Sequence, residues 1–331
     1  MDSILNSGIN WIVVLQGLGG WLTLPMNAFS FLGSEDFFMM VLPLLYWSVD
    51  AAIGLRVGVV LLVGSSLNDA FKLAFHAPRP YWISSKVQAF ASETSFGLPS
   101  GHSSTAVGVW GMLASRVKKP WAWIVAILVI FLIGISRMYL GVHFPSDVLL
   151  GWLLGAAILW LSIRLWEPVA SWLTKRTLGQ QILAGFAFSL LLILVAVIPY
   201  SILNVNGWQI PASWLQMAAQ TNPSGDIPNP TSLTGLFTST GTLFGLAAGL
   251  AWLNQRGGFN ARGIWWQRIL RYILGVIGLL IIRYGLKAIF PVGETWLASC
   301  FQYIRYAAIG FWVSAGAPLL FFALKLAKKD S

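Results

Sequence analysis

The chain of 331 residues is poor in charged residues, cysteine and histidine. Its single cysteine, Cys300, excludes an intrachain disulfide and leaves the redox compartment undecided. Charged residues make up 10% of the chain and hydrophobic residues 57%. With a mean hydropathy of +0.73, a soluble domain of this composition would expose a large apolar surface and aggregate. The scarcity of charge therefore excludes a soluble globular domain and indicates an integral membrane protein.

Positive charge is missing from two parts of the chain. Residues 1–10 contain no Lys or Arg, so the charged region of a cleavable signal peptide is absent. The polar loop 204–232 also has none. Other loops concentrate basic residues, which are Arg56, Arg116, Lys118, Lys119, Arg164, Lys175, Arg176, Arg256, Arg262, Arg268, Lys325, Lys328 and Lys329. Because Lys and Arg collect in cytoplasmic loops, this set predicts the cytoplasmic side. The net charge of +10 thus reflects topology, and no nucleic-acid partner is expected.

Apolar runs approach the ~20 residues that a membrane-spanning helix needs. They predict an all-α polytopic membrane helical bundle of about nine transmembrane helices, at 37–49, 52–75, 99–115, 121–140, 146–166, 181–203, 233–254, 264–290 and 299–325. The charge bias then puts the C-terminus in the cytoplasm and the segments 76–98 and 137–145 on the extracytoplasmic face. No endoplasmic-reticulum retention signal is visible at the C-terminus, which favours a bacterial inner or plasma membrane.

Glycine interrupts two apolar stretches in different ways. Gly17, Gly19, Gly20 and Pro25 interrupt residues 9–33, so an interfacial or re-entrant segment is expected there rather than a full span. The spacing of Gly245 and Gly249 predicts close helix packing.

All three histidines lie between Lys72 and Asp147, within three polar clusters. The first cluster runs from Lys72 to Arg79 at the outer end of the second predicted span. Ionisable groups at this depth line a cavity or form a pair, so an Asp69–Lys72 ion pair is the alternative to a functional site. His76 lies inside this cluster, and we expect only a loop hydrogen bond from it.

The second cluster, Ser100-Gly101-His102, begins the third predicted span. Ser100 is a favourable N-cap, and the free N–H groups of a helix start bind anions. Gly101 lets the backbone approach a bound oxyanion closely. Alone, this turn is weak support for a site, since Ser-Gly turns are common.

The third cluster contains Arg137, His143 and Asp147. If Pro145 starts a helix, Asp147 reaches back to the His143 ring, holds one tautomer and makes the other ring nitrogen more nucleophilic. A His–Asp bond with a purely structural role is the alternative. Together the clusters supply three cations and neutral donors, which suit a tetrahedral dianion. Two histidines among three cations do not suit a divalent metal, and the glycine loop of nucleotide hydrolases is missing.

These ordered motifs, Lys-x6-Arg-Pro, Pro-Ser-Gly-His and Ser-Arg-x5-His-x3-Asp, resemble the three-part signature of the phosphatidic acid phosphatase type 2 superfamily. That superfamily includes lipid phosphate phosphatases, prenyl pyrophosphate phosphatases, glucose-6-phosphatases and vanadium haloperoxidases. The nine-span layout looks like the branch of glucose-6-phosphatases and sphingosine phosphate phosphatases. The resemblance implies a phosphatase core with six helices in residues 1–175, carrying all motifs, and additional transmembrane helices in residues 176–331.

The resemblance also implies the roles of the residues. His143 would attack phosphorus, Asp147 would orient it, and His102 would act as acid and then as base. The phosphate-binding residues would be Lys72, Arg79, Ser100, Gly101 and Arg137. No metal or other cofactor is expected.

We expect an integral membrane phosphatase that hydrolyses a phosphomonoester, a lipid phosphate foremost, on the extracytoplasmic face. Alternative substrates are a soluble sugar phosphate or a prenyl pyrophosphate, and phosphoryl transfer to another acceptor is a further alternative. A transporter or scramblase that only binds phosphate is the alternative without enzymatic activity. Expected partners are the phosphorylated substrate and membrane lipids, with the oligomeric state open.

Several features have no assigned role. The loop 204–232, with its amphipathic patch 210–217, either covers a site or is a plain solvated connector. Lys86 and Glu93 either contact a head group or lie in a solvated loop. Basic residues near the outer ends of the last two spans extend an anionic-substrate site or pair with Glu294; they are Arg283, Lys287 and Arg305.

Overall fold

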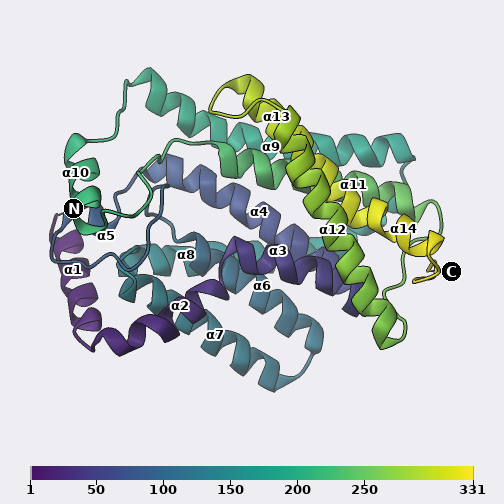
Figure 1. The fold of residues 1–331 in the computed structure, drawn as a ribbon, viewed down its shortest axis with the longest axis horizontal. Helices are drawn as coiled ribbons and strands as arrows, with labels where there is room; N and C mark the ends of the chain where they lie inside the picture. The colour runs from purple at the N-terminus through teal and green to yellow at the C-terminus, as the bar shows by residue number, and fades with distance from the viewer. Residues whose placement is uncertain (1, 331) are drawn as a thin grey trace. The chain divides into compact units, whose positions relative to one another are not determined.

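The computed structural model describes residues 2–330, with side chains from residue 5 onward, and this part of the chain is helical, with one isolated β-bridge between Asn260 and Lys328. The predicted all-α fold is confirmed. Figure 1 shows the helices, which are α1 (Asp2–Gln16), η1 (Gly20–Leu22), α2 (Thr23–Phe31), α3 (Glu35–Leu44), η2 (Leu45–Val49), α4 (Ala51–Phe75), α5 (Pro80–Ile83), α6 (Gly101–Val117), α7 (Pro120–Tyr139), α8 (Pro145–Thr174), α9 (Leu178–Val205), α10 (Ala212–Thr221), α11 (Thr234–Asn254), α12 (Trp265–Ile289), α13 (Trp296–Phe311), η3 (Trp312–Gly316) and α14 (Ala317–Ala323).

The chain divides into two compact units, each assembled from three segments. The first unit contains Met1–Phe38, Leu67–Trp160 and Val195–Ser232, and the second contains Met39–Ser66, Leu161–Leu194 and Leu233–Ser331. All three motifs lie in the first unit. The functional division expected at residues 175 and 176 stays a prediction.

Seven helical segments in the described part of the chain are long and apolar enough to cross a membrane, or eight if a bent N-terminal pair counts as one span. The expected count of nine is therefore not confirmed. Two expected spans are short in the structure: α6 has 17 residues, and the stretch around 37–49 is divided between α3 and the π-helical turn η2 before Asp50 breaks it. Multiple apolar helices nonetheless identify an integral membrane protein.

The N-terminal pair bends by 90° between Leu5–Gln16 and Gly20–Phe31. Gly19 enables the bend because its φ of 111° lies in a region that side chains disfavour. The segment is thus a broken one, as the glycines predict, and its interfacial or re-entrant placement stays a prediction.

Close helix packing in the first unit brings the second motif against the helix of the third. On α8, a Cβ at Gly151 would lie 2.6 Å from Ser100 O, and one at Gly155 would lie 2.4 Å from Ser104 O. These clashes mean that only glycine lets α8 approach the backbone of α6 this closely. The start of α6 and the start of α8 are held together as a result.

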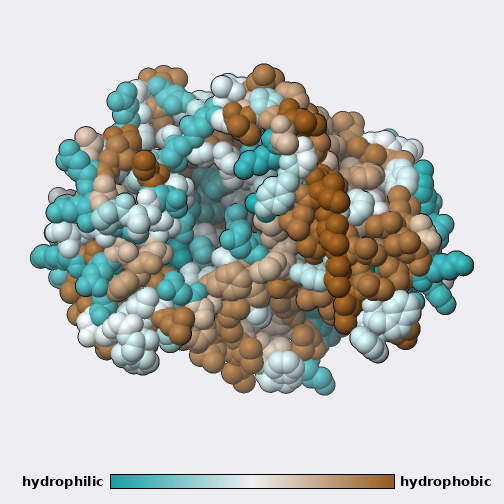
Figure 2. Space-filling model, in the orientation of Figure 1, coloured by the Kyte–Doolittle hydropathy of each residue, from teal (hydrophilic) through white to brown (hydrophobic). Residues whose placement is uncertain are grey.

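The second unit packs around glycines of α11, as Gly245 and Gly249 predict. A Cβ at Gly245 would lie 1.9 Å from Ala307 O on α13, and one at Gly249 would lie 2.2 Å from Ser314 Oγ. In this unit, α12 packs against α13 and carries a row of exposed apolar side chains, including Ile273, Ile277 and Ile281. Figure 2 shows this brown surface over α12, as expected for a helix facing lipid.

Candidate active site

The three motifs converge in the first unit, although 75 residues separate Lys72 from Asp147 in the sequence. Lys72 lies in the last turn of α4, and Arg79 precedes α5 in the following loop. Ser100 caps α6, and its hydroxyl accepts a hydrogen bond from Ser103 N. A backbone hydrogen bond of 2.9 Å from Ser100 N to Asp147 O joins the second motif to the third.

His143 and Asp147 form the contact that their spacing predicts. Asp147 lies in the first turn of α8, and its Oδ2 is 3.3 Å from His143 Nδ1. The same oxygen accepts a 2.9 Å hydrogen bond from Phe144 N, which holds the carboxylate against the ring. Both side chains are buried. The catalytic role of this pair stays a prediction.

Arg79 is fully buried beside His143, and all five of its N–H donors have partners within the protein. Nε donates to Ser95 O at 2.6 Å, and Nη2 donates to Ser95 Oγ and Phe96 O, both at 3.1 Å. Nη1 donates to Val142 O at 2.9 Å and to His143 Nε2 at 3.2 Å.

The contact between Arg79 and His143 fixes the state of the imidazole. A guanidinium has no acceptor, so His143 Nε2 accepts through its lone pair and Nδ1 carries the proton toward Asp147. Burial, and then the positive charge of Arg79, lower the pKa of His143 below its ordinary value. Its ring is therefore neutral, with the Nε2 lone pair available once the Arg79 hydrogen bond is given up.

Arg137 leaves a donor available to a ligand. Its Nη1 donates to Ser30 Oγ at 2.5 Å, and its Nη2 donates to Glu93 Oε1. Its buried Nε has no hydrogen-bond partner within residues 5–330. A buried N–H without an acceptor costs free energy, so a phosphoryl oxygen is a suitable partner for it.

Lys72 lies beside the start of α6. Its Nζ donates to Ser95 Oγ at 2.8 Å, and a Cβ built on Gly101 would be 3.9 Å from that Nζ. The first N–H groups of a helix have no acceptor within the helix and favour anions. Lys72 and the N-terminus of α6 thus form one electropositive region. His102 is the second residue of α6 and is partly buried, so its ring belongs to the same end of the helix.

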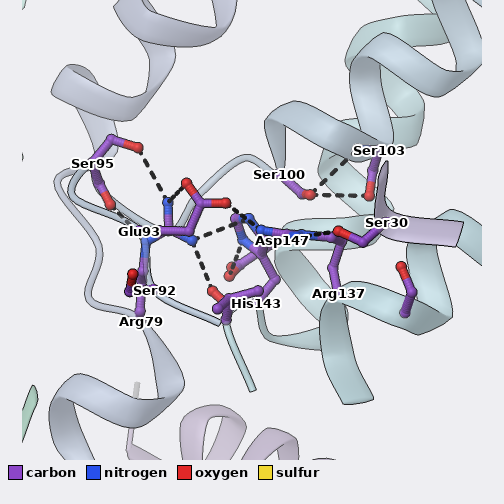
Figure 3. A network of polar contacts seen from close by, with 12 residues as sticks. Ser30, Arg79, Ser92, Glu93, Ser95, Ser100, Ser103, Arg137, His143 and Asp147 are labelled. Carbon is purple, nitrogen blue, oxygen red and sulfur yellow. Dashed lines mark hydrogen bonds and ion pairs between the residues drawn. The ribbon is translucent and has the colours of Figure 1, made fainter. Parts of the chain in front are cut away.

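The sequence did not decide whether Glu93 contacts a head group or lies in a solvated loop. Its carboxylate contacts Arg137 and lies 3.8 Å from Arg79 Nη2 (Figure 3), so it is not in a solvated loop. Burial raises the pKa of Glu93, but the charges of Arg137 and Arg79 outweigh burial and hold it below its usual range. The available signal was an acidic residue between two cationic motifs in a chain with 11 acidic residues.

His76 makes the expected loop hydrogen bond, from Nδ1 to Ala74 O at 3.1 Å. Its ring also meets Phe96 and Trp208 edge-on, with centroid distances of 6.3 and 6.4 Å. These contacts give His76 a structural role in the loop.

The loop 204–232 packs on the loop of the first motif instead of standing free. Its amphipathic patch forms α10, which contacts α5. Thr221 Oγ1 donates to Tyr81 O at 3.1 Å, Ser92 Oγ donates to Asp226 at 3.1 Å, and Asn229 N donates to Thr94 O at 2.9 Å. These contacts favour the interpretation that this loop covers the site.

Two basic residues of the last spans have partners in the second unit. Arg283 Nη1 is 3.0 Å from Met39 Sδ, and Arg305 Nη2 donates to Gln302 Oε1 at 3.2 Å. Their participation in an anionic-substrate site stays a prediction.

Comparison with known proteins agrees with the motifs. Residues 53–170 match the PAP2 superfamily, and residues 237–329 match the PAP2 superfamily phosphatase, transmembrane extension. Glucose-6-phosphatase 3 of Bos taurus is 30% identical over 186 residues, with 49% of this chain and 54% of that protein covered. The match thus spans about half the length of that relative.

Two further relatives extend the coverage. Phosphatidylglycerophosphatase B of Bacillus subtilis is 31% identical over 155 residues, covering 43% of this chain and 73% of that protein. Glucose-6-phosphatase 2 of Homo sapiens is 25% identical over 333 residues, covering 88% of this chain and 89% of that protein. Fold and site define an integral membrane protein with a buried histidine–arginine centre. The chain belongs to the PAP2 superfamily.

Proposed function

We propose that this protein is an integral membrane phosphatase that hydrolyses a phosphomonoester through a phosphohistidine on His143, without a metal ion. The arrangement of Arg79, His143 and Asp147 is the observation that carries the proposal. One ring nitrogen contacts a carboxylate and the other presents a lone pair beside a buried guanidinium. This is the geometry that a nucleophilic imidazole requires.

In the first step, His143 Nε2 attacks phosphorus and the ester P–O bond breaks. The departing alkoxide takes a proton from His102. A phosphoryl oxygen replaces His143 as the acceptor of the Arg79 Nη1 hydrogen bond, while Arg137 Nε and Lys72 bind other oxygens. Asp147 stabilises the positive charge that develops on the imidazole.

In the second step, water attacks phosphorus and the P–N bond breaks. His102, which gave up a proton in the first step, accepts a proton from the water, and His143 Nε2 regains its lone pair. Inorganic phosphate leaves and both histidines return to their starting states. The step needs only water, so atoms and protons balance.

A lipid phosphate is the proposed substrate, because a site in a helical membrane protein lets an acyl or prenyl tail stay in lipid while the phosphate enters. The phosphatidylglycerophosphatase relative supports this choice. A soluble sugar phosphate is the second candidate, supported by the similarity to glucose-6-phosphatase 2 along 88% of this chain.

We propose that the site opens on the extracytoplasmic face of a bacterial inner or plasma membrane and that the C-terminus is cytoplasmic. The distribution of Lys and Arg among the loops supports this orientation. An Asn222→Cys variant in a Cys300→Ser background tests it, since a membrane-impermeant thiol reagent should label intact cells. Labelling only after lysis would reverse the orientation.

The activity is tested with protein purified in detergent and a panel of lipid phosphates, prenyl pyrophosphates and sugar phosphates, with EDTA present. We expect phosphate release by the wild type and none by His143→Ala or His102→Ala. Release from no substrate, or equal release by the variants, contradicts the phosphatase. Loss of release on chelation alone contradicts the metal-free mechanism.

A further inference from the structure

Lys72, Arg79 and Arg137 form a group of cations that we call the phosphate cradle. This group already contains a carboxylate of the protein itself. Figure 3 shows Glu93 between Arg79 and Arg137, the two arginines that the mechanism assigns to the phosphoryl group. Its carboxylate occupies Arg137 Nη2, a donor that would otherwise be free for a phosphoryl oxygen. The side chain remains about a quarter exposed, so it faces the open part of the site as well as the two arginines.

The backbone of Glu93 is fixed in this place. Glu93 N donates to Tyr81 Oη at 3.0 Å, and Tyr81 Oη donates to Glu93 O at 3.1 Å. Tyr81 is itself buried, so it is a rigid partner. The next residue, Thr94, accepts a hydrogen bond from Asn229 N at 2.9 Å. These hydrogen bonds with Tyr81 and Asn229 therefore hold the loop in place and keep the carboxylate against the arginines.

The carboxylate changes the charge that a substrate meets. Lys72, Arg79 and Arg137 are the cations of the phosphate cradle, and the carboxylate of Glu93 lowers the sum of their charges by one. A pyrophosphate ester carries more negative charge than a phosphomonoester dianion and therefore meets this carboxylate at a greater cost. Repulsion between two like unit charges ~5 Å apart weakens binding by about fourfold in bulk water and by about 300-fold at an effective dielectric constant of about 20.

We propose that Glu93 is a specificity-determining residue that lowers the positive charge of the phosphate cradle and thereby favours phosphomonoesters over pyrophosphate esters. The inference rests on the proposed function for its biological meaning, but anion binding tests it without turnover. A purely structural role, in which Glu93 only holds Arg137, predicts equal effects on anions of different charge.

The test compares wild type, Glu93→Gln, Glu93→Asp and the loop control Ser92→Ala, each purified in detergent. Binding of inorganic phosphate and inorganic pyrophosphate is measured by calorimetry at pH 8. Glu93→Gln keeps the size of the side chain and removes its charge. We expect it to tighten pyrophosphate binding relative to phosphate by about tenfold or more. Glu93→Asp and Ser92→Ala keep the wild-type ratio within about twofold.

The same variants are assayed with a monoester and a prenyl pyrophosphate. The ratio of kcat/KM for pyrophosphate to that for monoester should rise in Glu93→Gln by a similar factor. A Glu93→Ala variant removes the same charge together with the side chain and should shift the binding ratio in the same direction as Glu93→Gln. This variant decides the matter if Glu93→Gln fails to fold.

The proposal is overturned by an unchanged phosphate-to-pyrophosphate ratio in Glu93→Gln or, if that variant fails to fold, in Glu93→Ala. A wild type that releases no phosphate contradicts the proposed phosphatase instead. In that case a changed binding ratio in Glu93→Gln still supports Glu93 as the residue that sets the charge of the cradle.

Discussion

Two arginines, one in each unit, are fully buried and donate to backbone carbonyls, but they differ in their side-chain partners. Arg79 in the first unit contacts backbone carbonyls, Ser95 and the ring of His143. Arg271 in the second unit, on α12, donates only to backbone oxygens: Nη2 donates to Ala261 O at 2.9 Å, with longer hydrogen bonds to Asn260 O, Arg262 O and Gln267 O.

The comparison shows that burial of an arginine does not by itself indicate a catalytic site. Both guanidinium groups are removed from water and need acceptors to offset the loss of hydration. The carbonyls around Arg271 serve to tie the segment before α12 to the helix. Only Arg79 also reaches a titratable group, and that contact gives it a chemical role.

The largest expected effect comes from removing the nucleophile. His143→Ala should lower kcat/KM by about 10⁴-fold or more, as seen for other enzymes that lose a nucleophile or its base. Rapid quenching with radiolabelled substrate should trap an acid-labile phosphoprotein in the wild type and none in the variant. A phosphoprotein in His143→Ala would show that another residue is the nucleophile.

Arg79→Lys tests whether the guanidinium group of Arg79, and not only its positive charge, is needed for activity. Lysine keeps the charge but offers three donors in place of a planar set of five. The carbonyls and His143 Nε2 cannot all be satisfied, so kcat/KM should fall by about 10²- to 10³-fold. Steady-state kinetics with a monoester measure this. Activity within threefold of wild type would mean that charge alone suffices there.

The pH dependence should show the influence of the buried site on His143. The neutral ring is the nucleophile, and its pKa lies below the ordinary value through burial and the charge of Arg79. Activity is therefore kept as pH falls through 6.5 and lost only when the pH reaches the lowered pKa. The profile of kcat/KM against pH, corrected for titration of the substrate, measures this. A loss centred at 6.5 or above contradicts the lowered pKa.

Arg271→Gln should have the smallest effect on the rate. It tests whether the buried arginine of the second unit has a structural role only. The variant leaves backbone carbonyls without a donor, which destabilises the fold by about 1–3 kcal/mol. The thermal unfolding midpoint in detergent should therefore fall, while kcat per folded molecule stays within about twofold of wild type. A loss of kcat comparable to that of Arg79→Lys would contradict a purely structural role for Arg271.

Much of this molecule follows from local patterns. The helices follow from apolar runs, the Ser100 cap from its position before α6, and the His143–Asp147 contact from four-residue spacing at a helix start. The count of spans did not follow, because hydropathy does not register that the stretch 37–49 is divided between α3 and η2 or that α6 is only 17 residues long.

The site divides in the same way. The sequence determined by itself that the protein is an integral membrane protein and which histidines and cations are candidates for phosphate chemistry, because composition and ordered motifs are local properties. Only the tertiary structure decided which donors are occupied: all five N–H groups of Arg79 have partners, whereas Arg137 donates once from Nη1 and once from Nη2 and its Nε has no partner within residues 5–330. It also decided that Glu93 lies among the cations, since hydrogen bonds between distant segments depend on how the chain folds in space.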